Sequence, residues 1–289
     1  DERFSGPSRR CALILSHEPS LTHPLGTDRL RDKVCIVTGA GQGIGRAAAR
    51  RLAAEGAIVI CADASEAAAE RTVSELLADG VHALKFVGDL MVYDNCQALI
   101  DLAIERFGRI DALVNNVGGA TDLKPFHEWE PQAIQDEMNR SILPTLWCCR
   151  AALPHMLRRR YGRIVNVGAE SARNGLWDRA PYNAGKGGVL ALTTSIARET
   201  APYGITCNCV SPGPTESEHD RIVERGIRTR AAASSNYMIE LNDKMMGTVP
   251  MNRRGTVYEH AAAIAFMASD DVGHITGQVL SAGGGMNML

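Results

Sequence analysis

The chain from residue 33 to residue 45 reads KVCIVTGAGQGIG, and this stretch decides the fold class. Its first part is an apolar run rich in valine and isoleucine, which predicts a buried β-strand over 34–38. Glycines then alternate with other residues up to Gly45, and an amphipathic segment over 46–55 predicts a helix. A glycine turn in this position is typical of dinucleotide-binding units, since it lets the backbone approach a pyrophosphate at the helix N-terminus. An ordinary tight turn is the alternative for this segment taken alone.

The same alternation of short apolar runs and amphipathic segments continues along the chain. Strands that are continuous apolar runs separated by helices indicate a parallel sheet covered on both faces. Right-handed crossovers then predict an α/β fold with a single doubly wound parallel sheet. The expected strands are 34–38, 58–62, 84–87, 111–114, 163–167, 205–210 and 278–281, and the clearest helices are 46–55, 65–79, 96–107 and 187–200.

Composition and charge argue against several classes of protein. The 289 residues carry a net charge of −2, whereas nucleic-acid-binding proteins usually show a basic excess. No run reaches the roughly 18 apolar residues that a membrane span needs. Of the eight cysteines, several lie in strand-like runs, and Cys207-x-Cys209 lacks a second ligand pair at metal-binding spacing. We therefore expect reduced core thiols, no metal, and a soluble cytoplasmic protein.

Residues 1–30 differ from the rest of the chain. They are polar, interrupted by prolines and without apolar periodicity, so we expect a flexible N-terminal extension. Residues 31–289 contain no internal repeat and no second composition regime. Although the length allows two domains, this uniformity predicts a single dinucleotide-binding domain.

An acidic residue follows the second predicted strand. Asp63 lies 18 residues after Gly45, close to the distance at which a carboxylate binds the adenosine ribose. Such a carboxylate accepts a hydrogen bond from the 2′-hydroxyl of NAD and repels the 2′-phosphate of NADP. Gln42 is neutral, so the glycine turn offers no cation to that phosphate. The sequence therefore favours NAD, while a plain turn residue at the strand end is the alternative for Asp63.

Five motifs occur in one order along residues 32–289. They are Thr38-Gly39-x-x-x-Gly43-x-Gly45, Asn115-Asn116-Val117-Gly118, Tyr182-x-x-x-Lys186, Pro212-Gly213 and a glycine-rich closing segment over 277–285. Together they resemble the short-chain dehydrogenase/reductase family. The resemblance implies hydride transfer to or from a nicotinamide cofactor and association into a homodimer or homotetramer.

The resemblance also implies roles for individual residues. Tyr182 would move the proton, Lys186 would hold the nicotinamide ribose hydroxyls, and Asn115 would stabilise the central strand. The implied catalytic residues are Tyr182, Lys186, Ser171 and Ser141. The implied cofactor-binding residues are Gly39, Gln42, Gly43, Ile44, Gly45, Asp63, Asp89 (at the adenine), Leu90, Asn116, Gly118, Tyr182, Lys186, Pro212, Gly213 and Thr215.

The Tyr182 and Lys186 pair makes chemical sense by itself. Their i and i+4 spacing places both side chains on one face of a helix. A free tyrosine has a pKa near 10, and an adjacent ammonium favours the phenolate. Lowering the pKa of Tyr182 to about 7 requires roughly 4 kcal/mol, which we expect from Lys186 together with the positive charge of NAD⁺. A surface tyrosine beside a solvated lysine is the alternative.

Three positions depart from the family's pattern. Ala169 stands where the family places its catalytic serine, and Ser171 follows two residues later. In an extended chain that shift keeps the side chain on the same face, so we expect Ser171 to reach the substrate, with turn capping as the alternative. Ser141 stands where the family has a helix asparagine that supports a water relay to the lysine. Thr215 comes two residues earlier than the carboxamide-binding threonine often does, and Ser217 occupies the later position.

The segments 117–119 and 140–149 resemble a narrower group within the family. This group comprises dehydrogenases of ring cis-diol carboxylates, of the benzoate-diol and p-cumate-diol types. The resemblance implies oxidation of a cyclohexadiene cis-diol to a catechol with NAD, with loss of CO₂ in the benzoate type. The alternatives are a short-chain dehydrogenase for another alcohol or ketone, such as a 3-oxoacyl or sugar-acid substrate, and a non-catalytic dinucleotide-binding protein.

Residues 216–254 precede the last expected helix, where the family places its substrate lid. Arginine is the natural bidentate partner of a carboxylate, and this segment carries Arg221, Arg225, Arg228, Arg230, Arg253 and Arg254. A solvated face or a subunit contact is the alternative for these arginines. Ordinary lid packing is expected for Met238, Met245, Met246 and Met251, with an adaptable apolar wall for a ring as the alternative.

Small residues follow Tyr182 along its predicted helix. They are Ala184, Gly185, Gly188, Ala191 and Thr194. Because small side chains allow close approach of two helices, we expect this face to pack against a symmetry mate.

Overall fold

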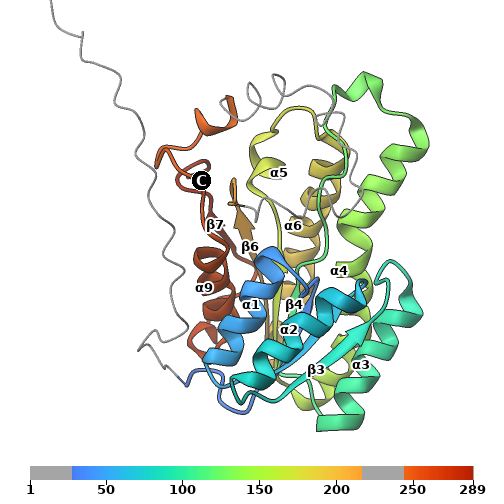
Figure 1. Cartoon of the computed structure of the whole chain (residues 1–289), viewed down its shortest axis with the longest axis vertical. Helices are drawn as coiled ribbons and strands as arrows, with labels where there is room; N and C mark the ends of the chain where they lie inside the picture. The colour runs from blue at the N-terminus through green and yellow to red at the C-terminus, as the bar shows by residue number, and fades with distance from the viewer. Residues whose placement is uncertain (1–27, 217–243, 289) are drawn as a thin grey trace, which may run out of the picture.

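The computed structural model describes residues 28–216 and 244–288, and these contain one seven-stranded parallel sheet (Figure 1). The strands are β1 Val34–Thr38, β2 Ile58–Asp63, β3 Ala83–Val87, β4 Ala112–Asn115, β5 Gly162–Val167, β6 Ile205–Pro212 and β7 Val279–Ala282. Their order is β3-β2-β1-β4-β5-β6-β7, which confirms the predicted doubly wound fold. The order reverses between β1 and β4, and ligands of such sheets bind outside the carboxyl ends of the strands at this point.

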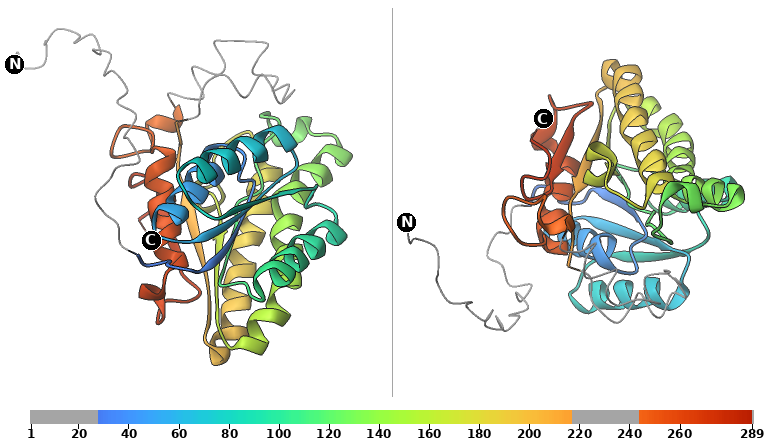
Figure 2. Two further views of the ribbon diagram at one scale, coloured as in Figure 1. Left: turned by 60° about the horizontal axis from the view of Figure 1, so that its bottom comes forward. Right: turned by 90° about the horizontal axis from the view of Figure 1, so that it is seen from above.

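Helices cover both faces of the sheet (Figure 2). The first face carries α1 Gly43–Ala54, α2 Glu66–Ala78 and α9 Val257–Ala268. The second face carries α3 Tyr93–Phe107, α4 Pro131–Arg159 and α6 Ala180–Thr200. Both α1 and α6 begin earlier than predicted, so α6 includes Tyr182 and the glycine turn leads directly into α1.

The five inner strands are buried on both faces, as a parallel sheet covered by helices predicts, whereas the edge strands β3 and β7 are only partly buried. All five residues of β1 and all six of β5 are buried. Seven cysteines of the described chain are free and buried, which confirms the expectation of reduced core thiols for them; Cys11 lies outside the described residues. Burial raises the pKa of the Cys149 thiol to about 12, so it stays protonated and unreactive at neutral pH.

The first described residues already belong to the packed structure. Arg29 donates two hydrogen bonds to the buried carboxylate of Glu55, at 2.6 and 2.9 Å. Leu30 is 1% exposed and lies in the core between the sheet and α1. Residues 29 and 30, the last two of the segment expected to be flexible, are therefore part of the packed domain. Residues 1–27 lie outside the described chain.

The small residues of α6 do not all face outward as expected. A β-carbon on Gly185 would lie 2.6 Å from Ser141 Cβ, and one on Gly188 would lie 2.5 Å from Ile142 Cδ1. These two glycines therefore let α6 pack against α4 of the same chain, which corrects the prediction for them. Ala184, Ala191 and Thr194 are exposed.

Replacing Leu30 with alanine tests whether the start of the described chain stabilises the fold. We expect Leu30→Ala to lower the free energy of unfolding by about 3 kcal/mol, because it removes a buried side chain from a packed core. Leu77 is 55% exposed, so Leu77→Ala should change stability by no more than about 0.5 kcal/mol. Denaturant unfolding of both variants makes the comparison, and equal, small losses would contradict this assignment of Leu30.

Candidate active site

The glycine turn after β1 brings three parts of the chain close together. A β-carbon on Gly45 would lie 2.0 Å from the carbonyl oxygen of Gly39, so a larger residue there would force the turn open. A β-carbon on Gly41 would lie 2.5 Å from Ala68 Cβ of α2. Gly43 begins α1 and Ile44 packs against the core, so the turn passes directly into the positive end of the α1 dipole. This geometry fits a pyrophosphate.

Asp63 ends β2 beside the glycine turn, as predicted. Its carboxylate accepts hydrogen bonds from the backbone N–H groups of Gly41 and Ser65, both at 2.9 Å. The residue is 8% exposed, so these bonds fix its carboxylate at the carboxyl edge of the sheet. Arg71 of α2 donates to the Gly41 carbonyl oxygen at 3.0 Å, which places a cation beside the turn that the sequence analysis did not anticipate.

The residues predicted to border the adenine and the central part of the cofactor site follow the carboxyl ends of β3 and β4. Asp89 follows β3, is exposed, and accepts a hydrogen bond from the Met91 N–H; the adjacent Leu90 is buried. Asn116 follows β4 and donates to the carbonyl oxygens of Thr38 and Gly39, at 3.1 and 3.3 Å. These two hydrogen bonds hold the glycine turn against the end of β4.

Asn115 links the central strands themselves. Its side-chain amide donates to Asn166 Oδ1 of β5 at 2.9 Å, as a strand-stabilising role requires. Both side chains are essentially fully buried. The bond fixes the relative positions of β4 and β5, whose carboxyl ends border the site.

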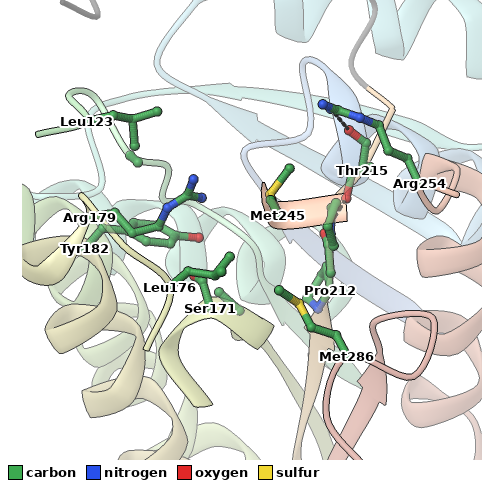
Figure 3. A pocket seen from close by; sticks show the side chains of 14 residues that line it. Leu123, Ser171, Leu176, Arg179, Tyr182, Pro212, Thr215, Met245, Arg254 and Met286 are labelled. Atoms are coloured by element: carbon green, nitrogen blue, oxygen red, sulfur yellow. Dashed lines mark hydrogen bonds between the residues drawn. The ribbon is translucent and has the colours of Figure 1, made fainter. Parts of the chain in front are cut away.

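A cavity of about 280 Å³ lies at the carboxyl ends of β5 and β6 (Figure 3). Its wall includes Ser171 and Tyr182 together with Pro212, Gly213 and Thr215. The other lining residues are Ala120, Leu123, Ala169, Leu176, Arg179, Pro214, Met245, Arg254 and Met286. Residues of two of the five motifs therefore meet the predicted residues Ser171 and Thr215 around one space.

Ser171 reaches this cavity, but not for the reason expected from the sequence. It lies in the first turn of a short helix, α5 Glu170–Asn174, and not in extended chain. Ala169 precedes this helix and also lines the cavity. The start of α5, and not the alternating side chains of an extended strand, directs the Ala169 and Ser171 side chains into the cavity.

Lys186 is one of the largest fully buried side chains of the described chain. It is 2% exposed, and its Nζ donates a hydrogen bond to the carbonyl oxygen of Val167 at the end of β5, at 2.7 Å. Burial lowers the pKa of Lys186 to about 8. A β-carbon on Gly118, whose φ is +141°, would lie 2.9 Å from this Nζ, so the lysine needs glycine at that position.

Tyr182 behaves differently from the prediction. Burial raises the pKa of Tyr182 to about 12, and the cation that opposes this rise is Arg179 rather than Lys186. The carboxylate of Glu137 adds to the rise. Lys186 is not among the charges that act on this pKa, so desolvation raises it in the protein without a dinucleotide. The expected lowering by Lys186 together with NAD⁺ stays a prediction.

Ser141 lies inside the contact between α4 and α6. It is fully buried, and within the described chain its hydroxyl oxygen has no hydrogen-bond partner. Its Cα would lie 3.8 Å from a β-carbon on Gly118, close to the Lys186 ammonium. A buried hydroxyl of this kind suits a bridging water. Asn139, two residues earlier, is exposed, as the helical turn predicts.

Thr215 is held by a residue that the sequence analysis did not identify. Its hydroxyl donates to the Gly213 carbonyl oxygen at 3.0 Å and lies 3.0 Å from Nε2 of His260. Because the hydroxyl proton is used, His260 Nε2 is assigned as the donor in the second contact. Burial lowers the pKa of His260 and keeps this imidazole neutral at physiological pH. Ser217 lies outside the described residues.

The predicted lid residues divide into several groups. Arg221, Arg225, Arg228, Arg230 and Met238 lie outside the described residues. Arg253 is paired with Glu259 at the surface, and Met251 is 59% exposed. Arg254 and Met245 line the cavity, together with Met286 and Arg179, which the sequence analysis missed. The i−3 spacing of Arg179 from Tyr182 was the available signal.

Comparison with known proteins agrees with this geometry. Residues 33–227 match the profile of the short chain dehydrogenase family. The chain is 43% identical over 259 residues to 1,6-dihydroxycyclohexa-2,4-diene-1-carboxylate dehydrogenase of Acinetobacter baylyi, covering 90% of this chain and 98% of that protein. The protein therefore belongs to the short-chain dehydrogenase family.

Two further similarities bear on the substrate and the cofactor. A 2,3-dihydroxy-2,3-dihydro-p-cumate dehydrogenase of Pseudomonas putida is 38% identical over 261 residues, covering 90% of this chain and 96% of that protein. The structure of an NAD⁺-bound xylitol dehydrogenase superposes with a TM-score of 0.81 at 31% identity, covering 88% of this chain and 99% of that chain. Among the helices of the described chain, none is long and apolar enough to cross a membrane.

The buried ammonium makes a prediction about stability. Below the folded pKa of about 8, Lys186 is charged in both states; between that value and its unfolded pKa of about 10.4, the unfolded chain binds more protons. Stability of the wild type relative to Lys186→Met should therefore rise by about 2 kcal/mol from pH 8 to pH 10. Denaturant unfolding across this range measures it. The surface variant Lys85→Met should show no such rise, and a flat difference for Lys186→Met would contradict the buried charge.

Proposed function

We propose that this protein is an NAD-dependent dehydrogenase that oxidises a cyclohexadiene cis-diol carboxylate to a catechol. The observation that carries the proposal is the cavity in which Tyr182, Ser171 and Arg179 share one wall beside the end of β6. The named relatives act on ring cis-diols that carry a carboxylate. The cavity supplies a proton acceptor, a hydroxyl and a cation for such a molecule.

The chain has a place for NAD that its own geometry supports. The glycine turn and the start of α1 would hold the pyrophosphate, Asp63 would accept from the adenosine ribose, and Asp89 and Leu90 would border the adenine. Asn116 and Gly118 would shape the central part of the site. Pro212, Gly213 and Thr215 would border the nicotinamide, with Thr215 oriented by His260. When bound, NAD⁺ accepts the hydride from the carbinol carbon and adds a positive charge.

Side chains of the cavity supply the groups that take the proton from the substrate's carbinol hydroxyl. Tyr182 accepts the proton of the carbinol hydroxyl, and Ser171 positions the oxygen that becomes a carbonyl. Lys186 holds the nicotinamide ribose hydroxyls, and Ser141 supports a water that connects this lysine to solvent. The charge of Arg179 and that of the dinucleotide together oppose the burial that raises the pKa of Tyr182.

The overall reaction balances without another reactant. Loss of a hydride from the carbinol carbon and of a proton from its hydroxyl gives a ketone next to the carbon that carries the carboxylate. Breaking the bond to that carboxylate releases CO₂ and leaves an enolate, which takes back the proton and becomes a catechol. For a 2,3-diol, whose carboxylate lies elsewhere on the ring, the carboxylate stays on the product.

Further properties belong to the same proposal. Residues 31–289 act as one catalytic domain; residues 217–243, most of the expected lid segment 216–254, lie outside the described chain. Ala184, Ala191 and Thr194 on the exposed face of α6 suit contact between subunits of a homodimer or homotetramer. The seven free buried thiols suit a reducing compartment such as the cytoplasm.

Removing the phenol hydroxyl tests the enzymatic assignment. In Tyr182→Phe, NADH formation from a carboxylated cyclohexadiene cis-diol should fall by about 10³-fold, because no group accepts the proton. NADH binding, followed by its fluorescence, should be unchanged. Tyr203→Phe, at an exposed position, is the control and should retain full activity.

The substrate panel separates the alternatives. It contains the carboxylated diol, the diol without a carboxylate, a 3-oxoacyl thioester with NADH, and simple secondary alcohols. Turnover of the thioester or an alcohol, but of no diol, would favour another substrate. A protein that binds NADH and turns over nothing would be a non-catalytic binder.

Asp63 should determine the choice between NAD and NADP. Asp63→Asn removes the charge and keeps a carbonyl oxygen for the Gly41 N–H, so the turn should stay folded. With Arg71 nearby, we expect the kcat/KM ratio of NAD⁺ to NADP⁺ to fall at least about tenfold, equivalent to about 1.4 kcal/mol. Asp79→Asn, at the far end of α2, should leave the ratio unchanged. An unaltered ratio in Asp63→Asn would rule out this role.

A further inference from the structure

Two cations line the cavity among its described residues, and they stand on different walls. Arg179 lies on the wall formed by α6, together with Tyr182, and Arg254 lies near Thr215 (Figure 3). Arg254 donates to the Thr215 carbonyl oxygen at 3.3 Å. The described lining contains no carboxylate, so its charged side chains favour an anionic ligand.

Arg179 is placed by the start of α6. It is the N-cap residue of that helix, and Tyr182 follows three residues later, a spacing that puts both side chains on one face. Figure 3 shows the Arg179 guanidinium close to the Tyr182 hydroxyl, between Leu123 and the side of the cavity that holds Leu176 and Ser171. The charge of Arg179 also opposes the rise in the pKa of Tyr182, as a nearby cation does.

Backbone hydrogen bonds hold the segment before α6 in place. The Asp178 carbonyl oxygen accepts from the Lys124 N–H at 2.8 Å, and the Arg179 carbonyl oxygen accepts from the Asn183 N–H at 2.9 Å. The Asn183 side chain donates to the Leu176 carbonyl oxygen at 2.9 Å. The guanidinium is therefore carried by a fixed backbone, which lowers the entropy cost of binding a ligand there.

The chemistry of the proposed substrate selects between the two arginines. In a 1,6-dihydroxycyclohexadiene-1-carboxylate, the carboxylate is bonded to the ring carbon next to the carbinol carbon. A ring whose hydroxyl meets Tyr182 must therefore present its carboxylate beside Tyr182, on the wall of Arg179. Arg254, near Thr215, lies toward the region assigned to the nicotinamide.

We infer that Arg179 binds the carboxylate of the ring substrate and sets the preference for carboxylated cis-diols. The inference rests on the proposed function and names the residue that recognises the substrate's anionic group. The planar guanidinium offers two parallel N–H donors to a carboxylate, which the single ammonium of a lysine does not.

The first test compares carboxylated and neutral diols. In Arg179→Met, both diols should lose activity because Tyr182 loses a nearby cation, but kcat/KM for the carboxylated diol should fall at least tenfold more than that for the same ring without a carboxylate. Arg179→Lys should recover part of the loss by keeping the charge. Arg254→Met is the matched control and should keep the preference. A preference that survives in Arg179→Met, or is lost in Arg254→Met, would overturn the inference.

A second test does not depend on turnover. Benzoate, an aromatic carboxylate, should bind to the full-length wild-type protein in the presence of NADH, as measured by calorimetry, and binding should be lost in Arg179→Met. Circular dichroism and NADH binding verify that the variant is folded. If wild type oxidises no diol but benzoate binding still requires Arg179, the proposed function fails and the carboxylate site stands. If benzoate binds equally to both proteins, the site is wrong.

Discussion

The buried ammonium of Lys186 is the constraint on which the rest of the site depends. Its hydrogen bond to the Val167 carbonyl oxygen ties α6 to the carboxyl end of β5, and its position requires glycine at residue 118. The close contact of Gly185 with Ser141 brings α6 near enough to α4 for this lysine to enter the interior. Within the described chain no carboxylate acts on the pKa of this ammonium, and its value of about 8 reflects the cost of burying the charge. Such costs are typical of functional sites.

The same desolvation acts in the opposite direction on Tyr182. Burial favours the neutral form of both groups, so the phenol becomes a weaker acid and the ammonium a stronger one. The protein without dinucleotide thus holds Tyr182 as a phenol. Proton transfer to it then depends on positive charge brought into the cavity, to which Arg179 contributes. Cofactor binding and base activation are coupled by this electrostatic requirement.

Much of this was predictable from the sequence, and the errors have physical causes. All seven strands were located from short, mainly apolar runs, and Asp63, Asn116 and Tyr182 were located because motif spacing fixes strand and helix ends. The packing of Gly185 was misjudged because small residues permit close approach without indicating the partner. The rise in the pKa of Tyr182 without a dinucleotide was not foreseen, since burial depends on distant segments. Arg179 was missed because it is the N-cap residue of α6 and lies just outside the Tyr182-x-x-x-Lys186 motif.

The central claim is that the carbinol hydrogen of a ring cis-diol is transferred to NAD⁺ beside Tyr182. The most direct measurement uses a 1,6-dihydroxycyclohexa-2,4-diene-1-carboxylate carrying deuterium at its carbinol carbon, the purified protein and NAD⁺. The account predicts that the deuterium appears in the reduced nicotinamide, with catechol and CO₂ formed in equal amounts. Deuterium released into water, or catechol formed without NADH, would contradict it.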